Sequence, residues 1–251
     1  MPPPPSHLPH NVQLTEGLTV TTIIRKAKTL IKSLFGRDLY RRIDCRCRKE
    51  RFGSEYGGWD VAVKKMNKDS IVYSFGVGED VSFDLALLGR FGLTVHAFDP
   101  TPKSITWVKR QEFPKNFIFH EYGIADFDGN ASFNPPVNPE HVSHTLLDRP
   151  ETKDRAIAVP VKRLSTIMKE LGHSRIDLLK MDVEGAEYGV IIDAVQSAIR
   201  PEQLLVEFHH KFPNVGIAKT EEAVSELRKM GYKLFSVSRT GDEFCFCHES
   251  R

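Results

Sequence analysis

Residues 71–80 read Ile-Val-Tyr-Ser-Phe-Gly-Val-Gly-Glu-Asp, an apolar run followed by two glycines one residue apart. The apolar part, Ile71–Phe75, has the length and composition of a buried strand. Gly76 and Gly78 would let the chain turn tightly and approach a ligand before the next helix begins. Two glycines are also typical of a plain tight turn, and Val81 stands where a dinucleotide-binding fingerprint has a third glycine. The rest of the chain must decide between these interpretations.

Short apolar runs and amphipathic segments alternate along the chain after this turn. Such alternation predicts a mostly parallel sheet that helices cover on both faces. The last two strands flank Thr240-Gly241-Asp242, which predicts an antiparallel hairpin. The predicted strands are Ile71–Phe75, Leu93–Phe98, Asn116–His120, Ile157–Val161, Ile176–Met181, Gln203–Phe208, Tyr232–Val237 and Glu243–Cys247, and the predicted helices are Val81–Phe91, Lys103–Gln111, Leu164–Leu171, Tyr188–Ala198 and Thr220–Met230.

Polar residues follow several of these strands, at the edge where open sheets of this kind bind ligands. Asp99 ends the second strand, 23 residues after Gly76, where an acid can accept hydrogen bonds from ribose hydroxyls. The backbone of Gly123-Ile124-Ala125 and the carboxylate of Asp126 follow the third strand, where they can contact an adenine edge. The fourth and fifth strands run into Asp182-Val183-Glu184-Gly185 and Glu207-Phe208-His209-His210. The sequence therefore predicts a nucleoside site beside a polar cluster.

Five segments, SFGVGED (74–80), HAFDPTP (96–102), YGIADFDG (122–129), LLKMDVEGAE (178–187) and LLVEFHH (204–210), resemble the FkbM-type family of class I S-adenosylmethionine-dependent methyltransferases. The resemblance covers about residues 70–240 and follows the family's order. It implies a Rossmann-like, doubly wound, mostly parallel seven-stranded sheet whose last strand is antiparallel. It also implies S-adenosyl-L-methionine as cofactor and methyl transfer to an oxygen of a small molecule or sugar.

One position departs from the family pattern. Ser74 stands on the first strand where such enzymes carry an acid, so contact to the methionine ammonium would fall to Glu79 or Asp80. With this change, the residues that we assign to the cofactor are Gly76, Gly78, Asp80, Phe98, Asp99, Ile124, Ala125 and Asp126.

Transfer of a methyl group to a hydroxyl needs donor and acceptor held in line and a base that removes the proton. The catalytic candidates are Asp182, Glu184 and His209. Alternation along a strand sends His209 and His210 to opposite sides, so one of them faces the pocket. Asp182, Glu184 and a histidine have the chemistry to bind Mg²⁺ instead, but their spacing does not require an ion, and we expect no metal.

The cysteines form two C-x-C pairs, Cys45/Cys47 and Cys245/Cys247, too few for a secreted disulfide framework. Four thiolates can bind zinc. Because the pairs are far apart in sequence and Phe246 lies between the last two, we interpret them as buried or edge thiols. The first residues lack the layout of a signal peptide, and no apolar run approaches the roughly 20 residues of a membrane span. We therefore expect a cytoplasmic protein.

The net charge of +2 hides a basic segment: residues 25–51 hold eleven Lys/Arg and three acids. We divide the chain into a disordered Pro-rich tail (1–20), a basic amphipathic helical extension (21–68) and a methyltransferase domain (69–251). The extension can dock on the domain or on a second subunit in a homodimer, or contact an anionic surface. The alternative function is a non-catalytic protein that binds RNA or anionic lipid through this arm. By its position, the Pro-rich loop Asn130–Arg155 is expected to contact the acceptor, and a disordered surface loop is the alternative interpretation.

Overall fold

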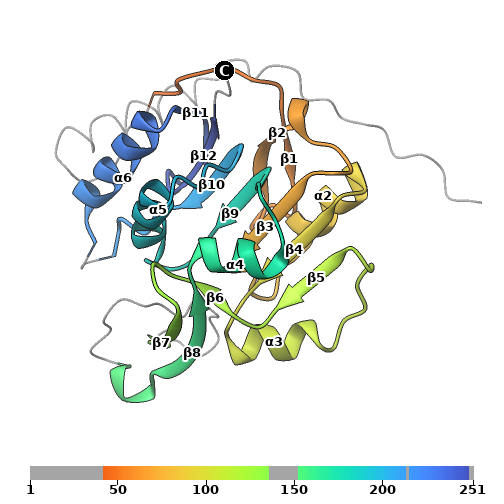
Figure 1. Cartoon of the computed structure of the whole chain (residues 1–251), viewed down its shortest axis with the longest axis vertical. Coiled ribbons are helices and arrows are strands. Elements are labelled where there is room, and N and C mark those ends of the chain that lie inside the picture. Colours follow the sequence, from red (N-terminus) through yellow and green to blue (C-terminus); the bar gives the residue numbers. More distant parts are fainter. Residues whose placement is uncertain (1–41, 136–151, 213–214, 249–251) are drawn as a thin grey trace, which may run out of the picture. The chain divides into compact units, whose positions relative to one another are not determined.

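The structure, a computed structural model, describes residues 42–135, 152–212 and 215–248 (Figure 1). The predicted tail (1–20), the start of the basic extension (21–41) and most of the predicted loop over 130–155 lie outside the described residues. Among the described residues, no helix has the length and apolar composition needed to cross a membrane.

The main sheet has seven strands in the order β11-β12-β10-β9-β3-β4-β5. β3 lies between β9 and β4, so the strand order reverses beside it, and β12 runs antiparallel between β10 and β11. This topology confirms the predicted Rossmann-like sheet with its antiparallel C-terminal hairpin. The strands are β3 (Ile71–Phe75), β4 (Thr94–Phe98), β5 (Phe117–His120), β9 (Leu178–Met181), β10 (Gln203–Glu207), β11 (Tyr232–Val237) and β12 (Glu243–His248).

Helices cover both faces of this sheet, because the central strands are apolar on both sides (Figure 1). Tyr73 and Phe75 of β3 pack into the core beneath α4 (Leu164–Leu171), α5 (Glu187–Gln196) and α6 (Ile217–Lys229). Val72 points the other way, into the core beneath α2 (Ser82–Phe91) and α3 (Pro102–Val108). The glycine turn thus leaves the sheet between two packed cores, which fix its position.

A β-hairpin occupies part of the segment that we predicted as a helical extension. β1 (Lys49–Phe52) and β2 (Trp59–Ala62) pair antiparallel, and a short 3₁₀ helix, η1 (Val63–Lys65), follows. Phe52, Trp59 and Val61 are buried in the α2 side of the core. The apolar alternation around Trp59–Val63 predicts a strand, which β2 confirms, and the helical description of the extension does not hold for residues 49–62.

A second, three-stranded sheet has the order β6-β8-β7, and the sequence patterns predicted only its β8 strand. It consists of β6 (Gly123–Ile124), β7 (Gly129–Phe133) and β8 (Ile157–Lys162), and η2 (Lys153–Arg155) precedes β8. Ala131 and Phe133 of β7 pack against Val159 and Val161 of β8. The first residues of the predicted loop Asn130–Arg155 are therefore a strand.

The C-x-C pairs come together at the β11–β12 side of the sheet. The Sγ atoms of Cys45 and Cys247 lie 3.7 Å apart, and Cys245 is buried. Asp44 anchors this segment, because its backbone N–H donates to Leu234 and its carboxylate accepts from the Leu234 N–H and from Arg228. Residues 44–45 thus lie along β11.

A cluster of histidines around the buried His96 should make the fold sensitive to acid. His96 contacts His120 (Nδ1–Nε2, 3.0 Å), and burial, together with the charges of His120 and His173, lowers the pKa of His96 to about 4. The folded state therefore binds this proton less readily than the unfolded chain, whose histidines titrate near pH 6.5, and stability is lost as the pH falls from 6.5 to 4. We expect the wild type to lose about 2–3 kcal/mol more than His96→Gln between pH 7 and 4.5. Urea unfolding at both pH values measures this, and equal losses would refute it.

Candidate active site

The turn after β3 brings three strand ends together. Gly76 and Gly78 have left-handed backbones (φ +75° and +55°), and the Gly76 N–H donates to the Phe98 carbonyl at 2.9 Å. A Cβ on Gly76 would lie 1.7 Å from the carbonyl oxygen of Asp182. Because no side chain fits there, the glycine is required, as the sequence indicated. The close approach places the start of the DVEGAE segment directly against the glycine turn.

Asp99, at the end of β4, holds this turn in place. Its Oδ2 accepts the Gly78 N–H at 2.9 Å, and its Oδ1 accepts the Thr101 N–H and hydroxyl at 2.9 and 2.6 Å. The residue is only 5% exposed. A carboxylate has about four lone-pair positions, so these bonds leave Oδ2 with room for one further donor.

The other predicted donor contacts differ in where their side chains lie. Phe98 is fully buried, stacked between Phe75 and His120 with ring centroids 4.2 and 4.5 Å away. Ile124 is buried in the core, and the Ala125 N–H donates to Lys162 in the second sheet. The side chains of Phe98 and Ile124 and the N–H of Ala125 therefore already contact other parts of the protein.

Asp126 is exposed and lies against α5. A Cβ built on Gly189 of α5 would lie 3.1 Å from its Oδ2. Gly123, three residues earlier, packs against the ring of Pro100, 3.1 Å from its own built Cβ. The third predicted motif thus lies beside the end of β4, with Asp126 as the acidic group that remains accessible.

Asp80 joins the glycine turn to the β1–β2 hairpin. Its Oδ2 accepts the Ser54 hydroxyl at 2.7 Å and its Oδ1 the Ser82 N–H at 2.9 Å. Burial opposes ionisation of Asp80, but the bonds from Ser82 and Ser54 outweigh burial and lower its pKa. Glu79 forms an ion pair with Lys103 of α3 at 3.3 Å. Both acids that we expected at the donor's ammonium group therefore already have protein partners.

Lys180 is a buried cation beneath the turn. Its side chain is 8% exposed, and its Nζ donates to the carbonyls of Gly76 at 2.9 Å and Phe75 at 3.2 Å. It pairs in register with Ser74, the position where the resemblance implies an acid. Asp84 of α2 is a buried acid nearby; burial raises its pKa to about 6, and the charge of Lys180 opposes this rise.

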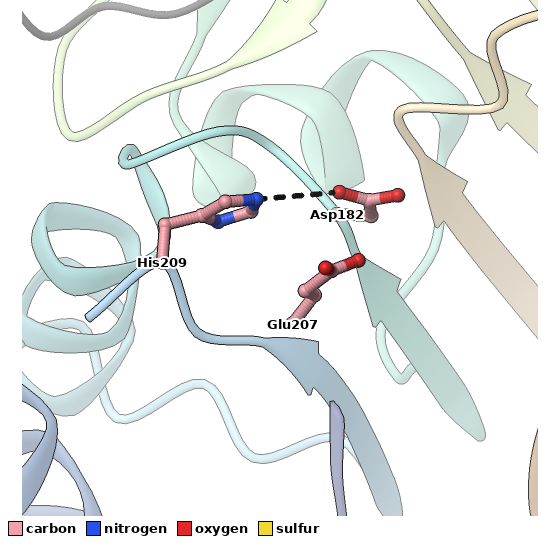
Figure 2. Close-up of side chains that lie close together, drawn as sticks. All are labelled: Asp182, Glu207 and His209. Atoms are coloured by element: carbon pink, nitrogen blue, oxygen red, sulfur yellow. Dashed lines mark ion pairs between the residues drawn. The ribbon is translucent and has the colours of Figure 1, made fainter. Parts of the chain in front are cut away.

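Three side chains converge where β9 and β10 end: Asp182, Glu207 and His209 (Figure 2). One oxygen or nitrogen from each lies within 4.8 Å of the others, and His209 Nε2 is 3.9 Å from Asp182 Oδ1. We did not predict Glu207 as a site residue. The signal was present, because residues 207 and 209 lie two apart and alternation places them on one side. His210 lies on the other side, 3.7 Å from Asp242.

Glu187, at the start of α5, positions His209. It is fully buried, and its Oε1 accepts the His209 N–H at 3.0 Å and lies 3.3 Å from the ring Nδ1. Its Oε2 accepts the Gly185 N–H, which fixes the loop before α5. Glu184, the third predicted catalytic residue, has a left-handed backbone (φ +50°) and places Oε2 3.6 Å from His209 Nε2.

The charges of this cluster change which group can act as a base. Burial disfavours the protonated form of His209, but Glu187, Glu184 and Asp182 outweigh burial and raise its pKa to about 10. Burial and the nearby Asp182 raise the pKa of Glu207 to about 8. Without a bound cation, the acids around His209 favour its protonated form, so a carboxylate is a better proton acceptor than this histidine.

Among the described residues, Tyr56, in the turn between β1 and β2, is the most exposed aromatic side chain, at 91%. Desolvation by nearby protein atoms, together with the charges of Asp182 and Glu207, raises its pKa. Tyr56 therefore lies within electrostatic range of the acidic cluster. Sequence patterns gave no signal for it.

Comparison with known proteins agrees with the topology. The family model described as the methyltransferase FkbM domain matches residues 70–234. The probable methyltransferase-like protein 24 of Homo sapiens is 26% identical over 188 residues, which cover 70% of this chain and 45% of the human protein. The corresponding protein of Rattus norvegicus is 25% identical, with coverage of 75% and 47%. The chain thus spans about half the length of these curated relatives.

A solved structure of the methyltransferase FkbM from Methylobacillus flagellatus KT has a TM-score of 0.48 and 14% identity, over 74% of this chain and 45% of that one. Aeropyrum pernix fibrillarin, solved with natively bound S-adenosyl-L-methionine, has a TM-score of 0.41 and 10% identity, over 82% and 83%. Since both scores are below 0.5, we base the family assignment on the domain match and the strand order.

Proposed function

Because this chain belongs to the FkbM methyltransferase family, we propose that it transfers a methyl group from S-adenosylmethionine to a hydroxyl of a small molecule or sugar. The observation that carries this proposal is the contact between Gly76 and the backbone of Asp182. It places a turn suited to a nucleoside ligand next to a cluster of acids and a histidine. Donor and acceptor can thus lie side by side at one edge of the sheet.

In this proposal the donor lies along the Gly76–Gly78 turn, with Asp99 Oδ2 accepting one ribose hydroxyl and Asp126 near the base. The acceptor lies at Asp182, Glu207 and His209. Its oxygen attacks the methyl carbon, the C–S bond breaks, and the electron pair stays on sulfur to give S-adenosylhomocysteine. A carboxylate of the cluster takes the hydroxyl proton, and the protein contributes mainly by holding the two reactants in line.

Direct binding of the donor tests this function without knowledge of the acceptor. Isothermal titration of the full chain with S-adenosylmethionine and with S-adenosylhomocysteine should show saturable binding at one site. The product should also raise the melting temperature, because it binds the folded state. Absence of binding and of any thermal shift with both compounds at millimolar concentration would refute the proposal.

Asp99→Asn should weaken donor binding about 10–150-fold, the scale of a charge-assisted hydrogen bond. The amide retains one acceptor oxygen but loses the charge, and it can no longer serve Gly78, Thr101 and a ribose hydroxyl together. Calorimetry with S-adenosylhomocysteine measures the change. Asp69→Asn, in an exposed loop, is the matched control and should bind like the wild type. An Asp99→Asn variant that is folded and binds normally would exclude a role at the donor.

A further inference from the structure

We infer that Asp182, Glu207 and His209 form a binding site for one divalent metal ion, for which Mn²⁺ is the suitable probe. The three residues offer two carboxylate oxygens and one imidazole nitrogen, all within 4.8 Å of one another. Carboxylates favour Mg²⁺ and Mn²⁺, and imidazole favours first-row transition ions. The mixed set therefore fits Mn²⁺ better than Ca²⁺. We had expected no metal here, and Glu207 was not among the ligands that we considered.

The spacing is close to that of a bound ion. Ligands at about 2.1 Å from an octahedral ion lie about 3.0 Å apart when adjacent and about 4.2 Å apart when opposite. The separation of His209 Nε2 and Asp182 Oδ1 is 3.9 Å, within this range. Three ligands of an octahedral ion include at most one opposite pair, so side-chain rotations must bring the other two separations to about 3.0 Å to close the site.

The contact between His209 and the buried Glu187 points independently to a ligand. His209 is 8% exposed, and the fully buried Glu187 lies against its Nδ1 and also accepts its backbone N–H. With Nδ1 directed at Glu187, Nε2 turns toward Asp182 (Figure 2). Histidines that bind metals commonly donate their other N–H to a carboxylate in this way, which fixes the ring and its tautomer. The buried carboxylate of Glu187 thus orients Nε2 of His209 toward the other carboxylates of the site.

The location of the site indicates a role for the ion in binding and activating the acceptor, and this role rests on the proposed function. Asp182 is the residue whose backbone contacts the glycine turn, and its side chain is 32% exposed, so the site opens to solvent beside the donor. Three protein ligands leave coordination positions for two oxygens of an acceptor. A metal-bound hydroxyl loses its proton more readily than a free one. The acceptor class that fits is a small molecule with a hydroxyl next to a second oxygen, such as a vicinal diol or a 2-hydroxy acid.

Mn²⁺ binding can be measured without any acceptor. The full chain, freed of metal with EDTA and dialysed, is titrated with MnCl₂ while electron paramagnetic resonance records the free ion. We expect one saturable site in the wild type. Asp182→Asn, Glu207→Gln and His209→Gln should each weaken binding at least about tenfold, and Glu187→Gln about 10–100-fold by releasing the imidazole. Glu243→Gln, which replaces the acid opposite Glu207 in β12, is the control and should keep near-normal affinity.

Thermal melts show whether each variant is folded. If a variant is not folded, the titration of the wild type with Mn²⁺ still tests whether the site exists. No saturable binding at millimolar Mn²⁺, or binding that survives all three ligand substitutions, would overturn the inference. Titration with S-adenosylhomocysteine in EDTA runs in parallel. Donor binding without metal binding refutes only the ion site, and metal binding without donor binding refutes the methyltransferase proposal and with it the task of the ion.

Discussion

Gly76→Ala should abolish donor binding and destabilise the protein by about 4 kcal/mol or more, the range of the most severe single substitutions. The new Cβ would lie 1.7 Å from the Asp182 carbonyl oxygen. This neighbour is backbone and cannot rotate away, so β3 and the segment after β9 must separate. The left-handed conformation at φ +75° adds a further cost of about 1–2 kcal/mol for a residue with a Cβ. Urea unfolding and titration with S-adenosylhomocysteine measure the two effects.

Gly92→Ala separates the steric effect from backbone strain. Gly92 ends α2 with φ +68°, nearly the same conformation, but a Cβ there meets nothing within 4 Å. We expect it to lose only about 1–2 kcal/mol and to keep full donor affinity. Equal behaviour of the two variants would show that the contact with Asp182 is not what makes Gly76 necessary, and the proposed junction of donor and acceptor sites would lose its main support.

Periodicity was sufficient to predict the main sheet because its strands are short apolar runs separated by amphipathic helices. Leu164–Leu171 was predicted with the bounds of α4, and the hairpin at the C-terminal end is present. The prediction failed where weak local signals are decided by packing. β7 has the sequence Gly-Asn-Ala-Ser-Phe and becomes a strand because Ala131 and Phe133 find Val159 and Val161. That pairing spans a long stretch of chain that no local window contains.

The sequence predicted where the candidate site residues lie better than it predicted which groups their side chains contact. Strand ends identified Asp99, Asp182 and His209, since parallel strands deliver their carboxyl ends to one edge. What each side chain touches depends on neighbours distant in sequence. Asp99 bonds to Gly78, and the buried Glu187 raises the pKa of His209. Glu207 and the buried Asp84 gain their significance only from the charges packed around them.

Ser74 stands on β3 where the resemblance implies an acid, and Asp84 of α2 supplies a carboxylate near Lys180 instead. Ser74 is fully buried and pairs in register with Lys180, so β3 offers no carboxylate to this lysine. Asp84 comes from α2 instead, one turn beyond the glycines, and is 2% exposed. The two groups interact electrostatically, and the lysine also bonds to two carbonyls of the turn. We infer that the buried charge fixes the turn against β9.

Lys180→Met should therefore destabilise the protein by about 3–5 kcal/mol, the usual cost of removing one partner from buried opposite charges. It leaves the carbonyls of Phe75 and Gly76 without their donor and Asp84 without its nearby cation. Because Asp84→Asn removes the acid that depends on this cation, the double variant should be more stable than the sum of the single losses by about 1–2 kcal/mol. Urea unfolding of all four proteins at pH 7.5 gives this coupling, and Lys229→Met, in an exposed ion pair on α6, should barely change stability. Strictly additive losses would mean that Lys180 acts through its bonds to the turn and its 3.9 Å ion pair with Asp182, and that α2 contributes no charge in place of the missing strand acid.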